Sequence, residues 1–204
     1  MSEGWFDIHC HLVPGIDDGA ADDIETLAMA RIAQSEGTST IIVTPHQLGN
    51  FRHNKGDRIR EATARLQESL NRERTGLVVL PGADVRIEPD LPELLATGEV
   101  LSLGDRRKHV LLELPHDIYF PLEPMLRELG KLGMTGILSH PERNRGIQQQ
   151  PDLVPELVDA GCLMQVTNGS LLGTFGPGCQ QLAERWVGEG LIHFLATDAH
   201  GAKA

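Results

Sequence analysis

The sequence lacks the features of several large classes of protein. Its 204 residues contain no run approaching the roughly 18 consecutive apolar residues that a membrane-spanning helix needs. The N-terminus, Met1–Gly4, has neither the basic nor the apolar segment of a secretory signal. Internal repeats and low-complexity stretches are missing as well. We therefore expect a soluble chain without a membrane span, and its length predicts one domain rather than two.

Cysteine and positive charge are both scarce. The three cysteines, Cys10, Cys162 and Cys179, form no CxxC pair, which is typical of reduced thiols in a cytoplasmic protein. Lysine and arginine number 18 against 29 aspartate and glutamate residues, a net charge of −11. This balance argues against nucleic acid as a partner, because phosphates would be repelled over most of the surface. An anionic substrate would need a local positive centre, such as metal ions or an arginine.

What the sequence does contain is a regular alternation of short β-branched runs and segments of helical period. Such alternation predicts an α/β protein with a parallel sheet, either open or closed as a barrel. The expected strands are Trp5–His9, Thr40–Thr44, Val78–Gly82, Val110–Leu114, Thr135–Ser139, Leu163–Thr167 and Ile192–Thr197. The expected helices are Asp23–Ser35, Asp57–Arg74, Pro121–Leu132, Pro151–Ala160 and Cys179–Gly188.

The position of potential metal ligands favours a barrel. Every expected strand except Leu163–Thr167 has a histidine or a carboxylate at or just after its C-terminal end. These residues are His9, His11, His46, Asp84, Glu113, His140, Asp198 and His200. A closed parallel barrel brings all such strand ends to one rim, whereas an open sheet gathers only those at its switch point. We therefore predict a distorted, TIM-like (β/α)7 barrel.

Two short motifs indicate what this rim does. His9-Cys10-His11 is followed by Asp18, and Asp198-Ala199-His200 stands near the other end of the chain. A single HxH is common in ordinary strands, but here several histidines and carboxylates recur at separate strand ends. Such a set suits a site for several divalent metal ions, and it indicates a metal-dependent hydrolase.

With these residues placed, the chain resembles the polymerase-and-histidinol-phosphatase (PHP) superfamily. In particular it resembles the manganese-dependent bacterial protein-tyrosine phosphatases of capsule and exopolysaccharide operons. The matching segments cover nearly the whole chain in one order. They are Asp7–Ala20, Ile41–His46, Leu80–Ile87, Leu111–Pro115, Ser139–Arg145, Gln165–Gly176 and His193–Gly201.

The resemblance implies a site for three divalent ions, with Mn²⁺ expected first and Fe²⁺ or Zn²⁺ as alternatives. The implied ligand sets are His9, His11, Asp84 and Asp198 for one ion; Asp84, Glu113 and His140 for a second; and Asp18, His46 and His200 for a third. Four carboxylates against three dications leave a formal charge of about +2, which attracts a phosphate dianion. A metal-bound hydroxide would then attack phosphorus in line, without a phosphoenzyme intermediate.

Arg143 is expected to bind two phosphoryl oxygens through its planar guanidinium. Asp198 or His200 could protonate the leaving group, and the choice between them stays open. Arg86 is either a support for Asp84, a contact for the substrate, or a plain solvated charge. His116, just after Glu113, could line the pocket.

The chain departs from the family at three points. Family members more often carry Glu at the position of Asp84 and His at the position of Gln47, and the second change is expected to affect the substrate pocket. They also usually continue for some tens of residues past the DAH motif, so we expect a single domain over residues 1–204 that lacks a closing segment. Another motif, the C-x5-R spacing of Cys179 and Arg185, has helix-forming residues inside it, and we interpret it as a chance match to cysteine phosphatases.

The function predicted from the sequence is therefore a cytoplasmic protein-tyrosine phosphatase that acts on a bacterial tyrosine kinase. Two alternatives stay open. One is a small-molecule phosphoesterase of the same superfamily, with a histidinol-phosphatase-like activity, and the other is a metal-binding regulatory domain without turnover.

Overall fold

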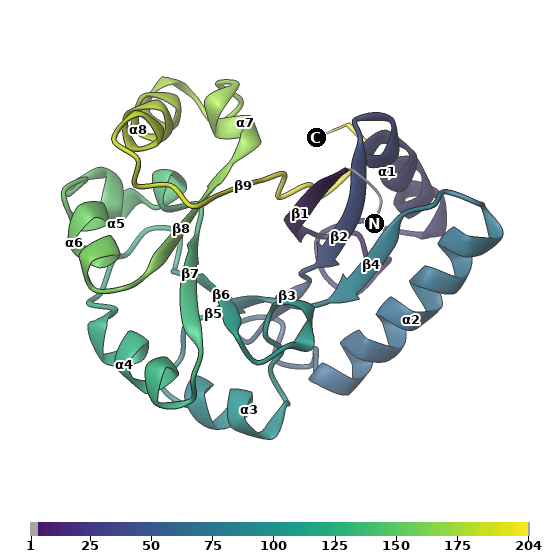
Figure 1. Ribbon diagram of the computed structural model, residues 1–204, viewed down its shortest axis with the longest axis horizontal. Helices are drawn as coiled ribbons and strands as arrows, with labels where there is room; N and C mark the ends of the chain where they lie inside the picture. The colour runs from purple at the N-terminus through teal and green to yellow at the C-terminus, as the bar shows by residue number, and fades with distance from the viewer. Residues whose placement is uncertain (1–3, 204) are drawn as a thin grey trace.

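The computed structural model describes residues 4–203, in which parallel strands alternate with helices and the helices lie outside the strands (Figure 1). The strands are β1 (Trp5–Cys10), β2 (Thr38–Val43), β3 (His46–Gln47), β4 (Val78–Pro81), β5 (Asp84–Arg86), β6 (His109–Glu113), β7 (Thr135–Ser139), β8 (Leu163–Thr167) and β9 (Phe194–Ala196). The helices are α1 (Asp23–Ser35), α2 (Gly56–Arg72), α3 (Leu91–Thr97), α4 (Glu123–Lys131), α5 (Arg145–Gln148), α6 (Leu153–Asp159), α7 (Asn168–Leu171) and α8 (Pro177–Gly188), with 3-10 turns η1 (Leu103–Asp105) and η2 (Pro141–Arg143).

All seven expected strands and all five expected helices are present, with ends displaced by at most two residues. The elements that the sequence did not predict are short: β3, β5, α3, α5 and α7. They contain between two and seven residues. Segments of this length carry too few residues for a period of 2 or 3.6 to be recognised.

The strands form two parallel sheets, in the orders β1-β2-β4 and β3-β5-β6-β7-β8-β9. The chain passes from the first sheet to the second just after β2 and again just after β4. Pro45 follows β2, and its missing N–H interrupts the ladder there. Gly82 follows β4, where a Cβ would lie 2.7 Å from Ile42 Cγ2, so only glycine allows this close approach.

The two sheets meet again at the ends of the chain. The segment after β9 returns to lie beside β1 (Figure 1), where the His11 N–H donates to the Ala199 carbonyl at 3.0 Å and the Asp198 N–H donates to the His9 carbonyl at 2.8 Å. Within residues 4–203 the ladders nevertheless remain two sheets and do not define one closed barrel. The predicted α/β class is confirmed, and the closed (β/α)7 barrel stays a prediction.

The interior between the strands is filled from both sheets. A small apolar cluster of Leu103, Leu111 and Ile137 is packed by side chains of β1, β2, β8 and β9. A larger core lies between the strands and the outer helices, as for the buried Ile59, Leu66 and Leu70 of α2. This double packing holds the C-terminal ends of the strands in fixed positions.

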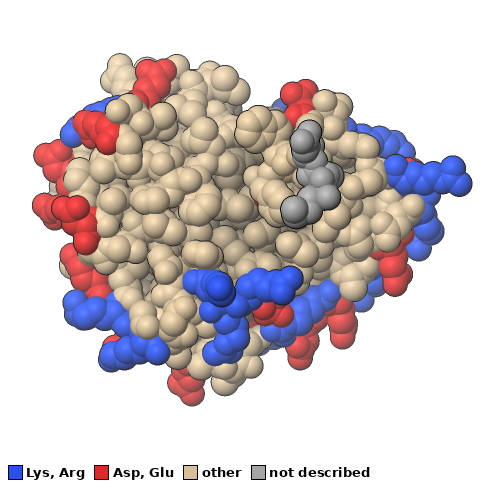
Figure 2. Space-filling model, in the orientation of Figure 1, with Lys and Arg blue, Asp and Glu red and all other residues tan. Residues whose placement is uncertain are grey.

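The surface is less one-sided than the net charge suggests. On the face drawn in Figure 2, acidic and basic side chains both lie mainly toward the edges, and uncharged residues cover much of the centre. Among the described residues, none of the helices is long and apolar enough to cross a membrane.

Candidate metal centre

All nine residues expected as metal ligands lie at the C-terminal ends of the strands and come together in one cluster. They fall into four overlapping groups, and within each group the potential ligand atoms lie within 4.8 Å of one another. The groups are His11, Asp18, His46 and His200; His9, His11 and Asp84; His9, His140 and Asp198; and His46, Asp84 and Glu113. Residues from both sheets, spread along the chain from His9 to His200, therefore share a single site.

The deepest part of this cluster consists of His9, His11, Asp84 and Asp198, whose side chains are at most 3% exposed. His9 Nε2 lies 3.0 Å from Asp198 Oδ1 and 3.7 Å from Asp84 Oδ2. Asp84 Oδ2 is buried and has no hydrogen-bond partner among the described residues. Burial of a carboxylate oxygen without a hydrogen-bond donor costs free energy, and a bound cation at this atom would offset that cost.

The mouth of the cluster is more open and is formed by Asp18, His46, Glu113 and His200. Asp18 Oδ1 lies 3.5 Å from His46 Nε2 and 3.6 Å from His200 Nε2. His46 Nδ1 lies 3.7 Å from Glu113 Oε2, so His46 faces both the inner and the outer part of the cluster. The Asp18 side chain is 60% exposed, which leaves this end accessible to a substrate.

Three of the histidines are oriented by hydrogen bonds on the ring side that faces away from the cluster. The Nδ1 atoms of His9, His11 and His200 lie 2.8 Å from Gln165 Oε1, 2.7 Å from Asp17 Oδ2 and 2.9 Å from the Asp198 carbonyl oxygen, respectively. Because these oxygens can only accept, each Nδ1 carries the proton and donates. Each Nε2 then presents a lone pair, as in a histidine that binds a metal.

One contact inside the cluster is unfavourable without a cation. His9 Nε2 and His11 Nε2 lie only 3.3 Å apart. Two imidazole lone pairs that face each other at this distance repel, unless a proton or a metal ion lies between them. The donor set consists of imidazole nitrogens and carboxylate oxygens, which suits Mn²⁺, Fe²⁺ or Zn²⁺. The residues present therefore fit a group of divalent ions.

The carboxylates raise the pKa of two histidines, and burial raises that of Glu113, whereas burial lowers the pKa of His140 to about 4. Burial would lower the pKa of His9, but Asp198 and Asp84 outweigh it and raise the pKa to about 10. Burial also opposes the charged form of His46, but Asp84 and Glu113 raise its pKa to about 9. Burial, aided by the charge of Asp84, raises the pKa of Glu113 to about 7. In the absence of metal, His9 and His46 therefore hold extra protons at neutral pH, and metal binding has to displace these protons.

Two residues that support the cluster were missed from the sequence. Asp17 binds the His11 ring and also accepts from the backbone N–H groups of His46 at 2.9 Å and Gly19 at 3.0 Å. Gln165 comes from β8, the one strand that carries no ligand-type residue at its end. The adjacent aspartates Asp17 and Asp18 were a usable signal, whereas a lone glutamine in a buried strand gave none.

The backbone is strained at two members of the cluster. His140 has φ of 34° and Asp198 has φ of 50°, in the left-handed region that residues other than glycine seldom adopt. Such strain persists only where the surrounding structure imposes it, and it is concentrated at functional sites.

Arg143 lies at the edge of the cluster, in η2. Its guanidinium pairs with the Asp198 carboxylate and lies 4.2 Å from the centre of the Phe175 ring. Beneath it, the buried Glu142 accepts hydrogen bonds from Ser170 Oγ at 2.6 Å and from the Thr167 N–H at 3.0 Å. These contacts hold η2 against β8 and α7.

The other candidates lie outside the cluster. His116 is exposed and belongs to none of the four groups. The C-x5-R segment from Cys179 to Arg185 is part of α8, and Arg185 pairs with Asp152 and Glu189 on the surface. Since the N–H groups of a helix are engaged within it, this segment forms no phosphate-binding loop, and its interpretation as a chance match is confirmed.

The α/β fold and the buried cluster of histidines and carboxylates at its strand ends are typical of a metal-binding α/β protein. The family model described as "Capsular polysaccharide synthesis, CpsB/CapC" matches residues 5–204, and the chain belongs to this family. The resemblance to bacterial capsule-type phosphatases stated above is thereby confirmed.

Similar proteins agree with this assignment. The chain is 41% identical over 97% of its length to "Tyrosine-protein phosphatase YwqE" of Bacillus subtilis, of which it covers 78%. It is 33% identical over 95% of its length to "Putative tyrosine-protein phosphatase CapC" of Staphylococcus aureus, of which it covers 76%. A solved structure described as one of the "unique metal-dependent tyrosine phosphatases" YwqE and CpsB matches with a TM-score of 0.93 and 40% identity, over 98% of this chain and 81% of that one.

Proposed function

We propose that this protein is a metal-dependent protein-tyrosine phosphatase. The observation that carries the proposal is the cluster itself, in which His9 Nε2 and His11 Nε2 face each other at 3.3 Å beside Asp84 Oδ2, which accepts no hydrogen bond among the described residues. The similarity to YwqE, which is named as a tyrosine-protein phosphatase, supports the reaction. Divalent ions held by the nine residues would supply a water of lowered pKa and would polarise the phosphate.

The number and kind of ions are part of this proposal. We propose three ions, Mn²⁺ in preference to Fe²⁺ or Zn²⁺, bound by the sets of ligands that the family resemblance implies. The four geometric groups overlap these sets in part. His11 also faces the outer group, His46 rather than His140 groups with Asp84 and Glu113, and His140 groups with His9 and Asp198. Asp84 lies between ligands of the first and the third proposed ions, since its Oδ2 lies 3.7 Å from His9 Nε2 and 3.4 Å from His46 Nδ1.

The roles of the remaining residues follow from their contacts. Arg143, next to Asp198, presents a planar guanidinium to phosphoryl oxygens at the mouth of the cluster. Asp198 is a poor proton donor, because despite its burial the charge of His9 holds its pKa far below the usual range. His200 donates from Nδ1 to the Asp198 carbonyl, which leaves Nε2 as a ligand rather than an acid. We therefore propose that the tyrosyl oxygen leaves without a proton from these side chains.

Several wider features belong to the same proposal. We propose that residues 1–204 act as one phosphatase domain and that the two sheets function as one interrupted barrel. The interior cluster shared by both sheets supports this view. We further propose a phosphotyrosyl protein, in particular a bacterial tyrosine kinase, as substrate in the cytoplasm. The three cysteines, all free and buried, are compatible with that compartment.

The test compares three substrates on the metal-free and the Mn²⁺-loaded protein: a phosphotyrosyl peptide, histidinol phosphate and p-nitrophenyl phosphate. We expect Mn²⁺-dependent turnover with a preference for the peptide. His46→Ala should lose most of this turnover. His109→Ala should retain it, because His109 is exposed and lies at the opposite end of β6 from Glu113. Metal binding without turnover would indicate a regulatory domain, and a preference for histidinol phosphate would indicate a small-molecule enzyme.

Replacement of Arg143 by Lys keeps the charge but removes the planar pair of donors. We expect kcat/KM for aryl phosphates to fall roughly ten- to a thousandfold, on the scale of one lost charge-assisted contact, with unchanged metal content. Unchanged kinetics would show that Arg143 does not contact the substrate.

A further inference from the structure

Beside the mouth of the metal centre lies a pocket of about 190 Å³. Its lining is formed by the loop after β3 together with Arg86 of β5 and Glu113 of β6. His46 and Glu113 belong both to this pocket and to the metal centre. A group attached to a phosphate at the mouth therefore has direct access to this pocket.

The loop that forms the pocket is held in one shape at its base. Gln47 is buried; its amide nitrogen donates to the Asn54 carbonyl at 2.7 Å and its amide oxygen accepts from the Leu101 N–H at 2.8 Å. The amide of Asn54 in turn donates to the His46 carbonyl at 3.0 Å. The sequence predicted an effect of Gln47 on the substrate pocket, and the structure shows that its amide fixes the pocket's loop.

The tip of the loop is a tight turn. The Phe51 N–H donates to the Leu48 carbonyl at 2.8 Å, and the Gly49 N–H donates to Glu88 Oε1 at 2.8 Å. Leu48 has φ of 68°, a strained conformation for a branched side chain, and Leu48 is buried. Strain of this kind is maintained only where the fold imposes it. The turn that contains Leu48 places the Phe51 ring against His46 of the metal centre.

Phe51 provides an aromatic surface next to the potential ligands. Its ring stacks on the His46 ring, with centres 5.3 Å apart and an angle of 22° between the planes. A second aromatic ring can pack against such a surface in an offset or edge-to-face arrangement. A dry cavity of about 150 Å³ is enough to bind benzene in another protein, so a phenyl group fits this space.

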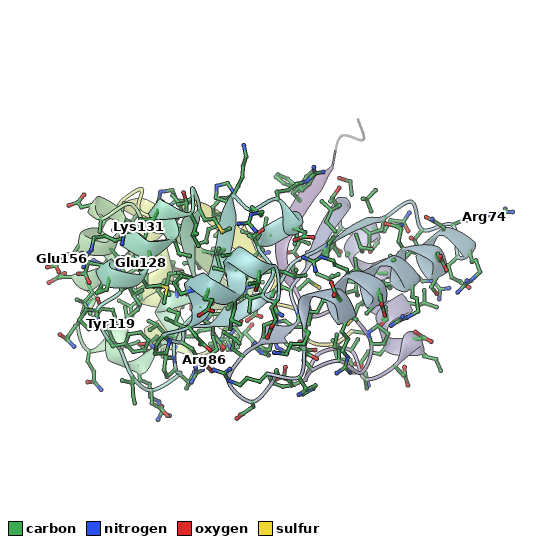
Figure 3. The ribbon with its side chains drawn as sticks, turned by 90° about the horizontal axis from the view of Figure 1, so that it is seen from below. Arg74, Arg86, Tyr119, Glu128, Lys131 and Glu156 are labelled. Atoms are coloured by element: carbon green, nitrogen blue, oxygen red, sulfur yellow. The ribbon has the colours of Figure 1, made fainter. Side chains whose placement is uncertain are left out.

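Arg86 adds a positive charge at the rim. In Figure 3 it lies on the lower side of the molecule, far from Arg74, which follows α2. Its Nη1 lies 3.7 Å from Glu113 Oε2 and donates to the Leu114 carbonyl at 3.4 Å. A guanidinium has five N–H donors, so most of those of Arg86 remain for a ligand, and its side chain is 33% exposed.

We propose that this pocket is the leaving-group subsite of the phosphatase, in which Phe51 packs against the phenyl ring of phosphotyrosine and Arg86 binds an acidic group of the substrate peptide. This inference rests on the proposed function. It assigns to the loop after β3 a preference for aryl over alkyl phosphates, and for peptides with acidic residues beside the phosphotyrosine.

Phe51→Leu tests the aromatic part, with Phe6→Leu as the matched control, since Phe6 is exposed on β1 at the opposite end of the strand from the cluster. Binding of phenylphosphonate and of methylphosphonate to the Mn²⁺-loaded proteins is measured by calorimetry, and turnover of a phosphotyrosyl and a phosphoseryl peptide is measured in parallel. We expect Phe51→Leu to reduce the aryl-to-alkyl ratio of affinities and of kcat/KM roughly two- to tenfold, on the scale of one aromatic pair. The control should keep the ratio of the wild type.

The outcomes separate this inference from the proposed function. An active wild type whose aryl-to-alkyl ratio is unchanged in Phe51→Leu would overturn the subsite and leave the phosphatase standing. Phe175 contacts Arg143 and does not line this pocket. The subsite would also be overturned if Phe175→Leu, rather than Phe51→Leu, removed the preference for aryl phosphates. A wild type that neither binds nor hydrolyses a phosphate would remove both.

Arg86→Met tests the charged part. Its turnover is compared on two phosphotyrosyl peptides, one flanked by glutamate and one flanked by glutamine. We expect the wild type to prefer the acidic peptide, less so at high salt, and the variant to lose this preference. A merely structural role of Arg86 through Glu113 would lower both rates equally and would overturn this part of the proposal.

Discussion

Individual side chains decide how the metal centre is oriented. His9 and His11 donate from Nδ1 to side-chain oxygens of Gln165 and Asp17, and His200 donates from Nδ1 to the backbone carbonyl of Asp198, so that each Nε2 faces inward. The oxygens differ in kind: an amide, a carboxylate and a backbone carbonyl. For His9 and His11, residues outside the expected ligand set therefore orient the imidazole rings.

Asp17→Asn tests this orientation. The change removes the negative charge beside the His11 ring. It also puts an amide N–H group in place of one of the two carboxylate oxygens that accept from His46, Gly19 and His11. We expect metal affinity to fall roughly 10- to 100-fold while the fold persists, as measured by metal titration and circular dichroism. Asp22→Asn, at the exposed N-cap of α1, is the matched control and should bind metal normally, because asparagine caps helices as well. Equal affinity in both variants would contradict the orienting role of Asp17.

Glu142 should make stability depend on pH. Burial raises its pKa to about 7, whereas the unfolded side chain titrates near ~4.3. The folded state therefore binds the proton more tightly, and this contribution to stability is complete below the unfolded pKa and is lost as the pH rises through 7. Glu142→Gln keeps an oxygen for Ser170 and Thr167 but does not titrate. In urea unfolding of the metal-free proteins from pH 4 to 8, the variant should gain stability relative to the wild type as the pH rises; parallel curves would disprove this.

At the scale of elements, short connections place the ligands. The loop between β1 and α1 folds back on its own start, since the Ala20 N–H donates to the His11 carbonyl at 3.1 Å. Gly19 lies directly against His11, where a Cβ would be 2.2 Å from its carbonyl oxygen. This contact brings Asp17 next to His11 and Asp18 next to His46 and His200.

Gly19→Ala should therefore displace the loop from His11. We expect a loss of roughly 1 to 3 kcal/mol in the free energy of unfolding, together with weaker metal binding. Gly130→Ala is the contrasting variant, because Gly130 is exposed in α4 and a Cβ there meets nothing within 4 Å. It should gain about 0.5 to 1 kcal/mol by the usual preference for alanine in helices. Thermal and urea unfolding measure both, and a tolerated Gly19→Ala would refute the close packing.

On the scale of the whole molecule, the metal centre joins the two sheets. β1 carries His9 from the first sheet, while β3, β5 and β6 carry His46, Asp84 and Glu113 from the second. Ions bound by both would therefore link them. Without metal ions, the buried Asp84 Oδ2 accepts no hydrogen bond among the described residues and lies 3.4 Å or more from the nearest imidazole nitrogens.

Removal of metal should consequently lower the melting temperature as well as activity. At a free metal concentration of 100 times Kd, one site stabilises the folded state by about 2.7 kcal/mol, which corresponds to a shift of roughly 5 to 10 °C for a chain of this size. Chelation should reverse this shift, and added Mn²⁺ should restore it, as followed by calorimetry. Asp84→Asn should show a much smaller shift on addition of Mn²⁺. A melting temperature that does not change with metal would mean that the cluster binds no ion.

The sequence by itself determined the order of the seven expected strands and five expected helices and all nine members of the cluster. These features depend on periodicity and on residue type, which are local. It did not determine β3 and β5, since these strands exist only because Pro45 and Gly82 let the chain pass from one sheet to the other.

Only the tertiary structure decided which residues support the ligands and where the pocket lies. Gln165 is 156 positions away from His9, and Phe51 and Arg86 line the same pocket from separate elements. Amide, aromatic and arginine side chains serve many roles, so their type alone reveals none. Their role follows from the distances that the fold imposes between them and the metal centre.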